Sequence, residues 1–154
     1  MSYNRKKRDR LPPFVALPWQ ILNSKAYIEL PPSACKALPY FFGKVKLAFQ
    51  DAQRYLAEFS FSYSEGKRLG FAFATFSKVI QALVHFGFID PVDKGGLRGD
   101  GKSYNLFKLS RRWETYGSVN FVSLDWRAFL PRTISKGTLK SETYNFKNGI
   151  KPVL

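Results

Sequence analysis

Residues 62–108 constrain the fold most strongly, because they combine two helical patterns, a glycine between them and two extended runs. The first helical pattern covers residues 63–69 and is broken by Gly70. The second begins after Ala72 and has apolar residues spaced so that one face is apolar over two turns. That face consists of Phe76, Val79, Ile80 and Leu83. Gly87 ends the pattern, where a left-handed residue suits the C-terminal cap of a helix.

The segments on either side of this helical pair have strand patterns. Residues 88–92 and 104–109 are extended runs, and the segment between them contains four glycines. This arrangement indicates a β-hairpin with a glycine-rich tip. Residues 59–62 alternate between apolar and polar side chains, so we expect a short strand there that pairs with the hairpin. The predicted order is therefore strand, helix, turn, helix and hairpin.

Residues 68–90 read RLGFAFATFSKVIQALVHFGFID. They describe a small helix ending at Leu-Gly, a three-residue turn, a helix carrying Thr-aromatic-Ser-Lys, and a Gly-Phe-Ile exit into the hairpin. In order and spacing this segment resembles the winged helix-turn-helix family of DNA-binding domains, in which the hairpin is the wing. Ala72 departs from the family pattern, because a Ser or Thr usually caps the second helix. The resemblance implies an α+β fold in which a helical N-terminal part and a short strand precede the helix-turn-helix at residues 63–86 and the wing at residues 88–109.

Basic residues are in excess along the whole 154-residue chain, and the excess is densest at its two ends. The net charge is +14, with five basic residues against one acidic in residues 1–10 and six against two in residues 118–154. An excess of this size favours polyanionic partners, because binding releases their counterions. We predict a basic flexible arm at residues 1–13, one winged-helix domain at residues 14–130 and a flexible basic tail at residues 131–154.

The second helix of the motif carries the candidate base-reading residues. At about 100° per residue, the side opposite the apolar face contains Ala74, Lys78, Gln81 and His85. In the family the N-terminal half of this helix lies nearest the bases of the major groove. The resemblance therefore implies DNA contacts from Thr75, Ser77, Lys78 and Gln81. Gln81 is chemically suited to adenine, and Lys78 to guanine or a phosphate.

Phe73, at the start of the same helix, has two interpretations. Its ring either contacts a thymine methyl group or packs against Phe71 and the preceding helix. The remaining candidates are placed to hold the DNA backbone. They are Tyr63 and Lys67 on the first helix, Lys94, Arg98 and Lys102 on the hairpin tip, and Arg5, Lys6, Lys7, Arg8 and Arg10 in the arm. The alternative for the arm is a solvated tail that adds only solubility.

Residues 96–103 also match the phosphate-binding pattern G-x-x-x-x-G-K-[ST]. That chemistry needs a helix beginning at Lys102 and Ser103, because its first amides bind the phosphates. Residues 103–109 instead have the aromatic-rich composition of a strand, without helical spacing. We therefore expect a basic hairpin tip and no nucleotide hydrolysis.

Three further expectations concern segments outside the motif. Ser33 is placed to cap a helix that Pro39 either kinks or splits. Arg111 and Arg112 follow the last strand and either touch phosphate or form a solvated surface pair. Apolar residues between positions 121 and 129 indicate a piece that docks on the core before Pro131.

Catalysis, metal binding and membrane insertion have little support in the sequence. Cys35 is the single cysteine and His85 the single histidine, so no nucleophile with a base and no His/Cys metal cluster is predicted. No apolar run reaches the roughly 18 residues of a membrane span. We expect a cytoplasmic, nucleoid-associated protein that is not an enzyme and needs no cofactor.

We expect the protein to bind specific sequences in double-stranded DNA as a transcriptional regulator. Residues 19–38 loosely resemble the N-terminal extension and first helix of winged-helix proteins carried by phages and plasmids. Replication initiation or partition is therefore an alternative. A third role is that of a winged-helix adaptor that binds protein or RNA. A homodimer remains open, as does a protein partner bound through the C-terminal tail.

Overall fold

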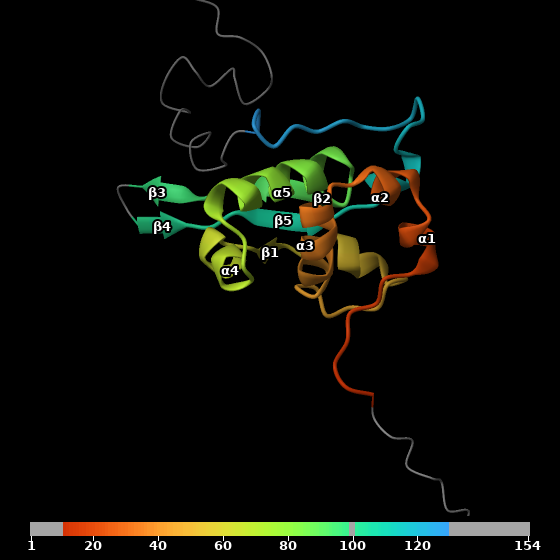
Figure 1. Ribbon diagram of the computed structural model, residues 1–154, viewed down its shortest axis with the longest axis horizontal. Coiled ribbons are helices and arrows are strands. Elements are labelled where there is room, and N and C mark those ends of the chain that lie inside the picture. Colours follow the sequence, from red (N-terminus) through yellow and green to blue (C-terminus); the bar gives the residue numbers. More distant parts are fainter. Residues whose placement is uncertain (1–10, 99–100, 130–154) are drawn as a thin grey trace, which may run out of the picture.

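Five α-helices and a small antiparallel sheet form the described part of the protein (Figure 1). The computed structural model describes residues 11–98 and 101–129. The helices are α1 (Trp19–Leu22), α2 (Lys25–Glu29), α3 (Pro32–Phe42), α4 (Tyr63–Arg68) and α5 (Phe73–His85). Two short 3₁₀ turns are η1 (Ala52–Tyr55) and η2 (Arg112–Thr115). This architecture confirms the predicted α+β class.

The main sheet has three antiparallel strands in the order β1-β5-β2. Its strands are β1 (Phe59–Ser60), β2 (Ile89–Asp93) and β5 (Leu106–Leu109). The expected pairing of the short first strand with the hairpin is confirmed, since Phe59 lies opposite Phe107 of β5. This strand ends at Ser60 and not at Ser62, because Ser62 caps α4.

The glycine-rich segment is more regular than the sequence predicts. Beyond a bulge in β2, the hairpin continues as a second two-stranded ladder. Its strands are β3 (Gly96–Arg98) and β4 (Gly101–Ser103). Lys102 and Ser103 therefore lie in a strand, and the helix that a phosphate-binding loop requires does not start at these residues. The pattern at residues 96–103 therefore lacks the helix that follows a phosphate-binding loop.

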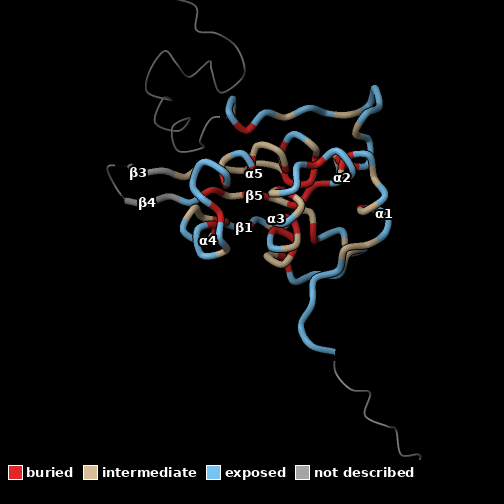
Figure 2. The backbone as a smooth tube through the Cα atoms, viewed as in Figure 1, coloured by how far each residue is buried: buried red, intermediate tan, exposed pale blue. Residues whose placement is uncertain are grey.

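A cluster of phenylalanine rings fills the space between the helices and the sheet. Phe41 of α3 lies at its centre, with ring centroids 4.4 Å from Phe61, 5.8 Å from Phe107 and 6.3 Å from Phe76. All four residues are at most 1% exposed. Figure 2 shows buried positions gathered where α3 and α5 face the sheet. Each ring removed from water contributes about 1.5–3 kcal/mol, so this cluster determines how α3, α5 and β5 are placed.

Helix α3 differs from the expectation at two positions. It continues through Pro39 as one α-helix, although the sequence suggests a kink or a split. Its apolar face, including Phe41, is buried, and this burial outweighs the loss of one backbone hydrogen bond. Ser33 does not cap the helix, because Pro31 occupies the N-cap and Pro32 the first helical position, where a missing amide hydrogen costs nothing.

Glycine ends both helices of the central pair, as predicted. Gly70 and Gly87 have φ angles of 91° and 88°, in the left-handed region that other residues rarely adopt. Gly87 also lacks room for a side chain, because a Cβ there would lie 2.6 Å from the backbone nitrogen of Trp113. Ala72 is the N-cap of α5 and offers no side-chain hydrogen bond, because an alanine side chain has no polar atom.

A capping box and an ion pair hold α4 in place. The Ser62 side chain accepts a hydrogen bond from the Glu65 amide, and the Glu65 carboxylate accepts one from the Ser62 amide. The same carboxylate pairs with Lys44, which follows α3 in the chain. Burial raises the pKa of Glu65, but hydrogen bonds from Lys44 and Ser62 outweigh it and bring the pKa below its ordinary value of 4.5.

Glu65 should make the stability of the protein depend on acidic pH. Because its pKa is lower in the folded than in the unfolded state, its contribution is present above the unfolded pKa and is lost as the pH falls through the folded pKa. We expect the urea midpoint of the Glu65→Gln variant to fall less than that of the wild-type protein between about pH 6 and about pH 3. Identical pH profiles of the two proteins would show that Glu65 has no such role.

Candidate nucleic-acid interface

Helix α5 has the predicted division into a buried and an outward side. Its four predicted core residues are at most 1% exposed. On the outer side Thr75 and Lys78 are exposed, while Ser77 and Gln81 are half-buried. The candidate base-reading side chains therefore lie on one side of α5, and the opposite side of the helix packs in the core.

Two aromatic rings stack on the surface at the N-terminal end of α5. Phe73 is the first residue of α5, and Tyr63 is the first residue of α4. Their ring centroids lie 4.2 Å apart, and the ring planes make an angle of 22°. Phe73 therefore packs against the preceding helix, as one interpretation expects. Its ring partner is Tyr63 rather than Phe71, whose ring is buried against Phe76. Even so, Phe73 is 70% exposed.

Lys94 lies between β2 and the β3–β4 extension of the hairpin, not at the hairpin tip as predicted. It directly follows β2, and its Nζ donates a 2.8 Å hydrogen bond to the carbonyl oxygen of Trp126. The same ammonium group lies 4.7 Å from the centroid of the Trp126 ring. Desolvation lowers the pKa of Lys94, while the charge of Asp125 acts in the opposite direction. This lysine therefore serves a contact within the protein.

The other basic candidates are distributed over three places. Arg98 and Lys102 lie on the paired strands β3 and β4. Lys67 is exposed on α4. In Figure 1 the hairpin extension, α4 and the N-terminal end of α5 lie at the same end of the molecule. The arm residues Arg5, Lys6, Lys7, Arg8 and Arg10 lie outside the described residues, as does the tail of residues 131–154.

Residues 118–129, here called the C-terminal strap, run alongside the outer side of α5 (Figure 1). An open groove of about 580 Å³ separates the strap from the helix. One wall consists of Lys78, Gln81, Ala82 and His85 of α5, and the other of Ser123, Leu124, Asp125 and Arg127 of the strap. The C-terminal half of the predicted reading side therefore faces the strap, an arrangement that no local sequence pattern indicates.

Trp126 fastens the strap to the core. It is 3% exposed, and its ring centroid lies 5.4 Å from that of Phe107 on β5. The Phe129 ring stacks on the Trp126 ring, and the two ring centroids lie 6.1 Å apart. These contacts confirm the expectation that the apolar residues before Pro131 dock on the core.

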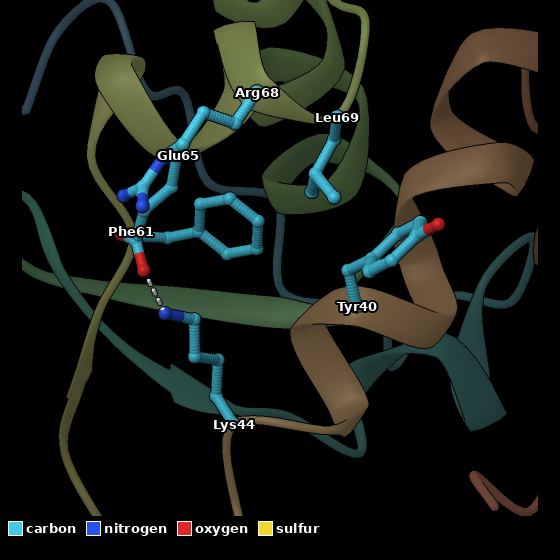
Figure 3. A pocket seen from close by; sticks show the side chains of 6 residues that line it. All are labelled: Tyr40, Lys44, Phe61, Glu65, Arg68 and Leu69. Atoms are coloured by element: carbon cyan, nitrogen blue, oxygen red, sulfur yellow. Dashed lines mark hydrogen bonds and ion pairs between the residues drawn. The ribbon is translucent and has the colours of Figure 1, made fainter.

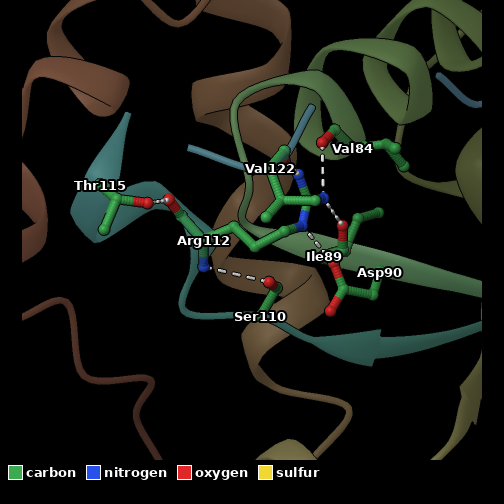
Figure 4. A network of polar contacts seen from close by, with 7 residues as sticks. All are labelled: Val84, Ile89, Asp90, Ser110, Arg112, Thr115 and Val122. Carbon is green, nitrogen blue, oxygen red and sulfur yellow. Dashed lines mark hydrogen bonds and ion pairs between the residues drawn. The ribbon is translucent and has the colours of Figure 1, made fainter. Parts of the chain in front are cut away.

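Arg112 is a structural residue, contrary to both roles expected for it. Its Nε donates a 2.6 Å hydrogen bond to Asp90, and its Nη2 donates to the carbonyl oxygens of Val84 and Ile89 at 2.7 and 3.0 Å (Figure 4). Its Nη1 donates to the carbonyl oxygen of Val122 in the strap at 2.9 Å. With its side chain only 14% exposed, Arg112 joins the end of α5, β2 and the strap.

A second hollow, of about 310 Å³, lies between α3 and α4 (Figure 3). It is lined by Tyr40, Lys44, Phe61, Glu65, Arg68 and Leu69. Its walls are mainly apolar, and Lys44 and Glu65 pair with each other. Because Lys44 and Glu65 pair with each other, Arg68 and the Tyr40 hydroxyl are the polar groups that this hollow offers to a small molecule.

The described residues provide neither a metal site nor a membrane span. Across residues 11–98 and 101–129, no group of three or more His, Cys, Asp or Glu side chains is arranged to hold a metal ion. In the same ranges no helix has both the length and the apolar character needed to cross a membrane. No family model matches the chain, and no curated protein or solved structure matches it either.

Arg112→Lys should destabilise the protein although it keeps the positive charge. A lysine cannot replace the four hydrogen bonds of the guanidinium group, so we expect the free energy of unfolding to fall by about 2–4 kcal/mol. Arg111→Lys is the matched control, because the Arg111 side chain is 62% exposed. It should change the free energy by less than about 0.5 kcal/mol in the same urea titration. Equal stability of the two variants would contradict the structural role.

Proposed function

We propose that this chain is a winged helix-turn-helix protein that binds specific sequences in double-stranded DNA, with α5 in the major groove. The outward side of α5 carries the proposal. There, Thr75, Lys78 and Gln81 offer groups that hydrogen-bond to base edges, and they project from a helix whose opposite side is fully buried. A helix held this firmly loses little further backbone freedom when its side chains contact the bases.

The hairpin supports the same docking. Its extension lies at the end of the molecule where α5 begins (Figure 1). With α5 in the major groove, β3 and β4 would lie beside the phosphate backbone, where Arg98 and Lys102 supply positive charge. Lys67 on α4 is exposed and would add a further phosphate contact. The net charge of +14 favours such a polyanionic partner.

The strap limits how much of α5 would reach the bases. Gln81 and His85 face the strap across the groove, whereas Phe73 and Thr75 do not line it. The N-terminal half of α5 would therefore enter deepest, with Lys78 and Gln81 at the limit of the contact. Arg112 and Lys94 are engaged within the protein and are not expected to bind phosphate.

Transcriptional regulation is the role we propose for this binding. Replication initiation or partition in a phage or plasmid is the alternative, and it is favoured by the loose resemblance of residues 19–38, which form α1, α2 and most of α3. A requirement for origin DNA in a replication assay would distinguish the alternative from the first role.

Selection from random duplex DNA tests the proposal. At about 0.15 M salt, where screening limits purely electrostatic binding, the purified protein should enrich a defined motif. Lys78→Ala and Gln81→Ala should each lose discrimination at a base position, by about 1–3 kcal/mol. Arg98→Ala should instead weaken binding to all sequences to a similar extent.

Lys46→Ala is the matched control for these variants. Lys46 is exposed in the segment after α3, outside the proposed interface, so its loss should leave the enriched motif unchanged. Binding without enrichment that collapses as salt rises would overturn specific recognition and favour an adaptor for RNA or protein. An equal loss on every sequence for Lys78→Ala, Gln81→Ala and Arg98→Ala would contradict the role of α5 as the reading helix.

A further inference from the structure

An apolar area surrounds the first residue of α5. Phe73 is 70% exposed, and its neighbours Ala72 and Ala74 are exposed as well. The next outward side chains are polar or basic, among them Thr75 and Lys78. A single exposed phenylalanine is common on protein surfaces and is not evidence of a binding site. The contacts that hold this ring in place are therefore the evidence that matters.

The Phe73 ring is held by a column of aromatic rings that begins in the core. Phe73 stacks on Tyr63, and Tyr63 meets Phe76 nearly edge-on, with centroids 5.6 Å apart and planes at 80°. Phe76 is 1% exposed and lies directly against Gly66, where an added Cβ would be 2.7 Å from the ring. The exposed ring is therefore positioned before any partner arrives, which lowers the entropy lost on binding.

We infer that Phe73, positioned by Tyr63, recognises the C5 methyl group of a thymine in the major groove. The inference rests on the proposed docking of α5, in which the first residues of the helix lie nearest the bases. Base edges in the major groove present hydrogen-bond donors and acceptors, and the thymine methyl is the apolar group among them. A hydrocarbon ring with exposed alanines beside it is complementary to that methyl group and offers nothing to the polar edges.

Replacement of thymine by uracil tests the inference, because these bases differ only in the methyl group. The full-length protein is titrated with its selected duplex and with duplexes that carry deoxyuridine at each thymine in turn. Moving one methyl group out of water corresponds to about a fourfold change in the binding constant. We expect one of these replacements to lower the affinity of the wild-type protein for the duplex by this factor. The same replacement should leave the affinity of the Phe73→Ala variant unchanged.

Variants of Tyr63 separate positioning from contact. The methyl effect is the ratio of the affinities for the thymine duplex and for the uracil duplex. Tyr63→Phe keeps both rings of the surface stack, so this variant should keep the full methyl effect. Tyr63→Ala removes the support for Phe73 and should reduce the effect. Phe73→Leu keeps an apolar side chain and should retain part of it. Phe73 is exposed, so its variants should fold like the wild-type protein, as circular dichroism would verify.

Three results would overturn the inference and leave the proposed function standing. The first is that the wild-type protein binds its site specifically but with the same affinity whichever thymine is replaced by uracil. The second is that uracil weakens binding by Phe73→Ala as much as binding by the wild-type protein. The third is that the selected motif contains no invariant thymine. A failure to bind any duplex would overturn the proposed function together with this inference.

Discussion

The burial of Phe76 is the contact on which the rest of the described structure depends. Its ring lies 6.3 Å from Phe41 of α3, 5.3 Å from Phe61 and 5.8 Å from Phe71, measured between centroids. Since Phe76 belongs to α5, burying it determines the rotation of that helix about its own axis. Thr75 and Lys78 then have to face outward. The outward side of α5 is thus a consequence of core packing, and it would be disturbed by any change that moves this ring.

Basic side chains serve two separate purposes in this protein. Arg112 donates to carbonyl oxygens, Lys94 donates to the carbonyl oxygen of Trp126, and Lys44 pairs with Glu65. A cation engaged in this way cannot also neutralise a phosphate without leaving its partners unsatisfied. The net charge of +14 therefore overstates how many cations are available to a polyanion.

Local patterns in the sequence predicted single elements well, because their causes lie within a few residues. The buried face of α5 follows from its apolar spacing, and the left-handed positions at Gly70 and Gly87 follow from the one residue type that adopts them without strain. Contacts between distant segments were not predictable in this way. Arg112 reaches the carbonyl oxygen of Val84, 28 residues earlier, and no local pattern indicates that bond. The groove beside α5 likewise exists only because Trp126 docks on a strand that precedes it in the chain.

The attachment of the strap through side chains has a consequence for its motion. The backbone amides of Phe121 and Phe129 bond to carbonyl oxygens only three residues away, while Trp126, Lys94 and Arg112 supply the contacts to the rest of the fold. Such a segment can open when the Trp126 ring withdraws and the hydrogen bonds from Lys94 and Arg112 break, without breaking any strand ladder. Its amide hydrogens should therefore exchange with solvent through a local opening that needs less free energy than global unfolding. Each such opening would widen the groove beside Gln81.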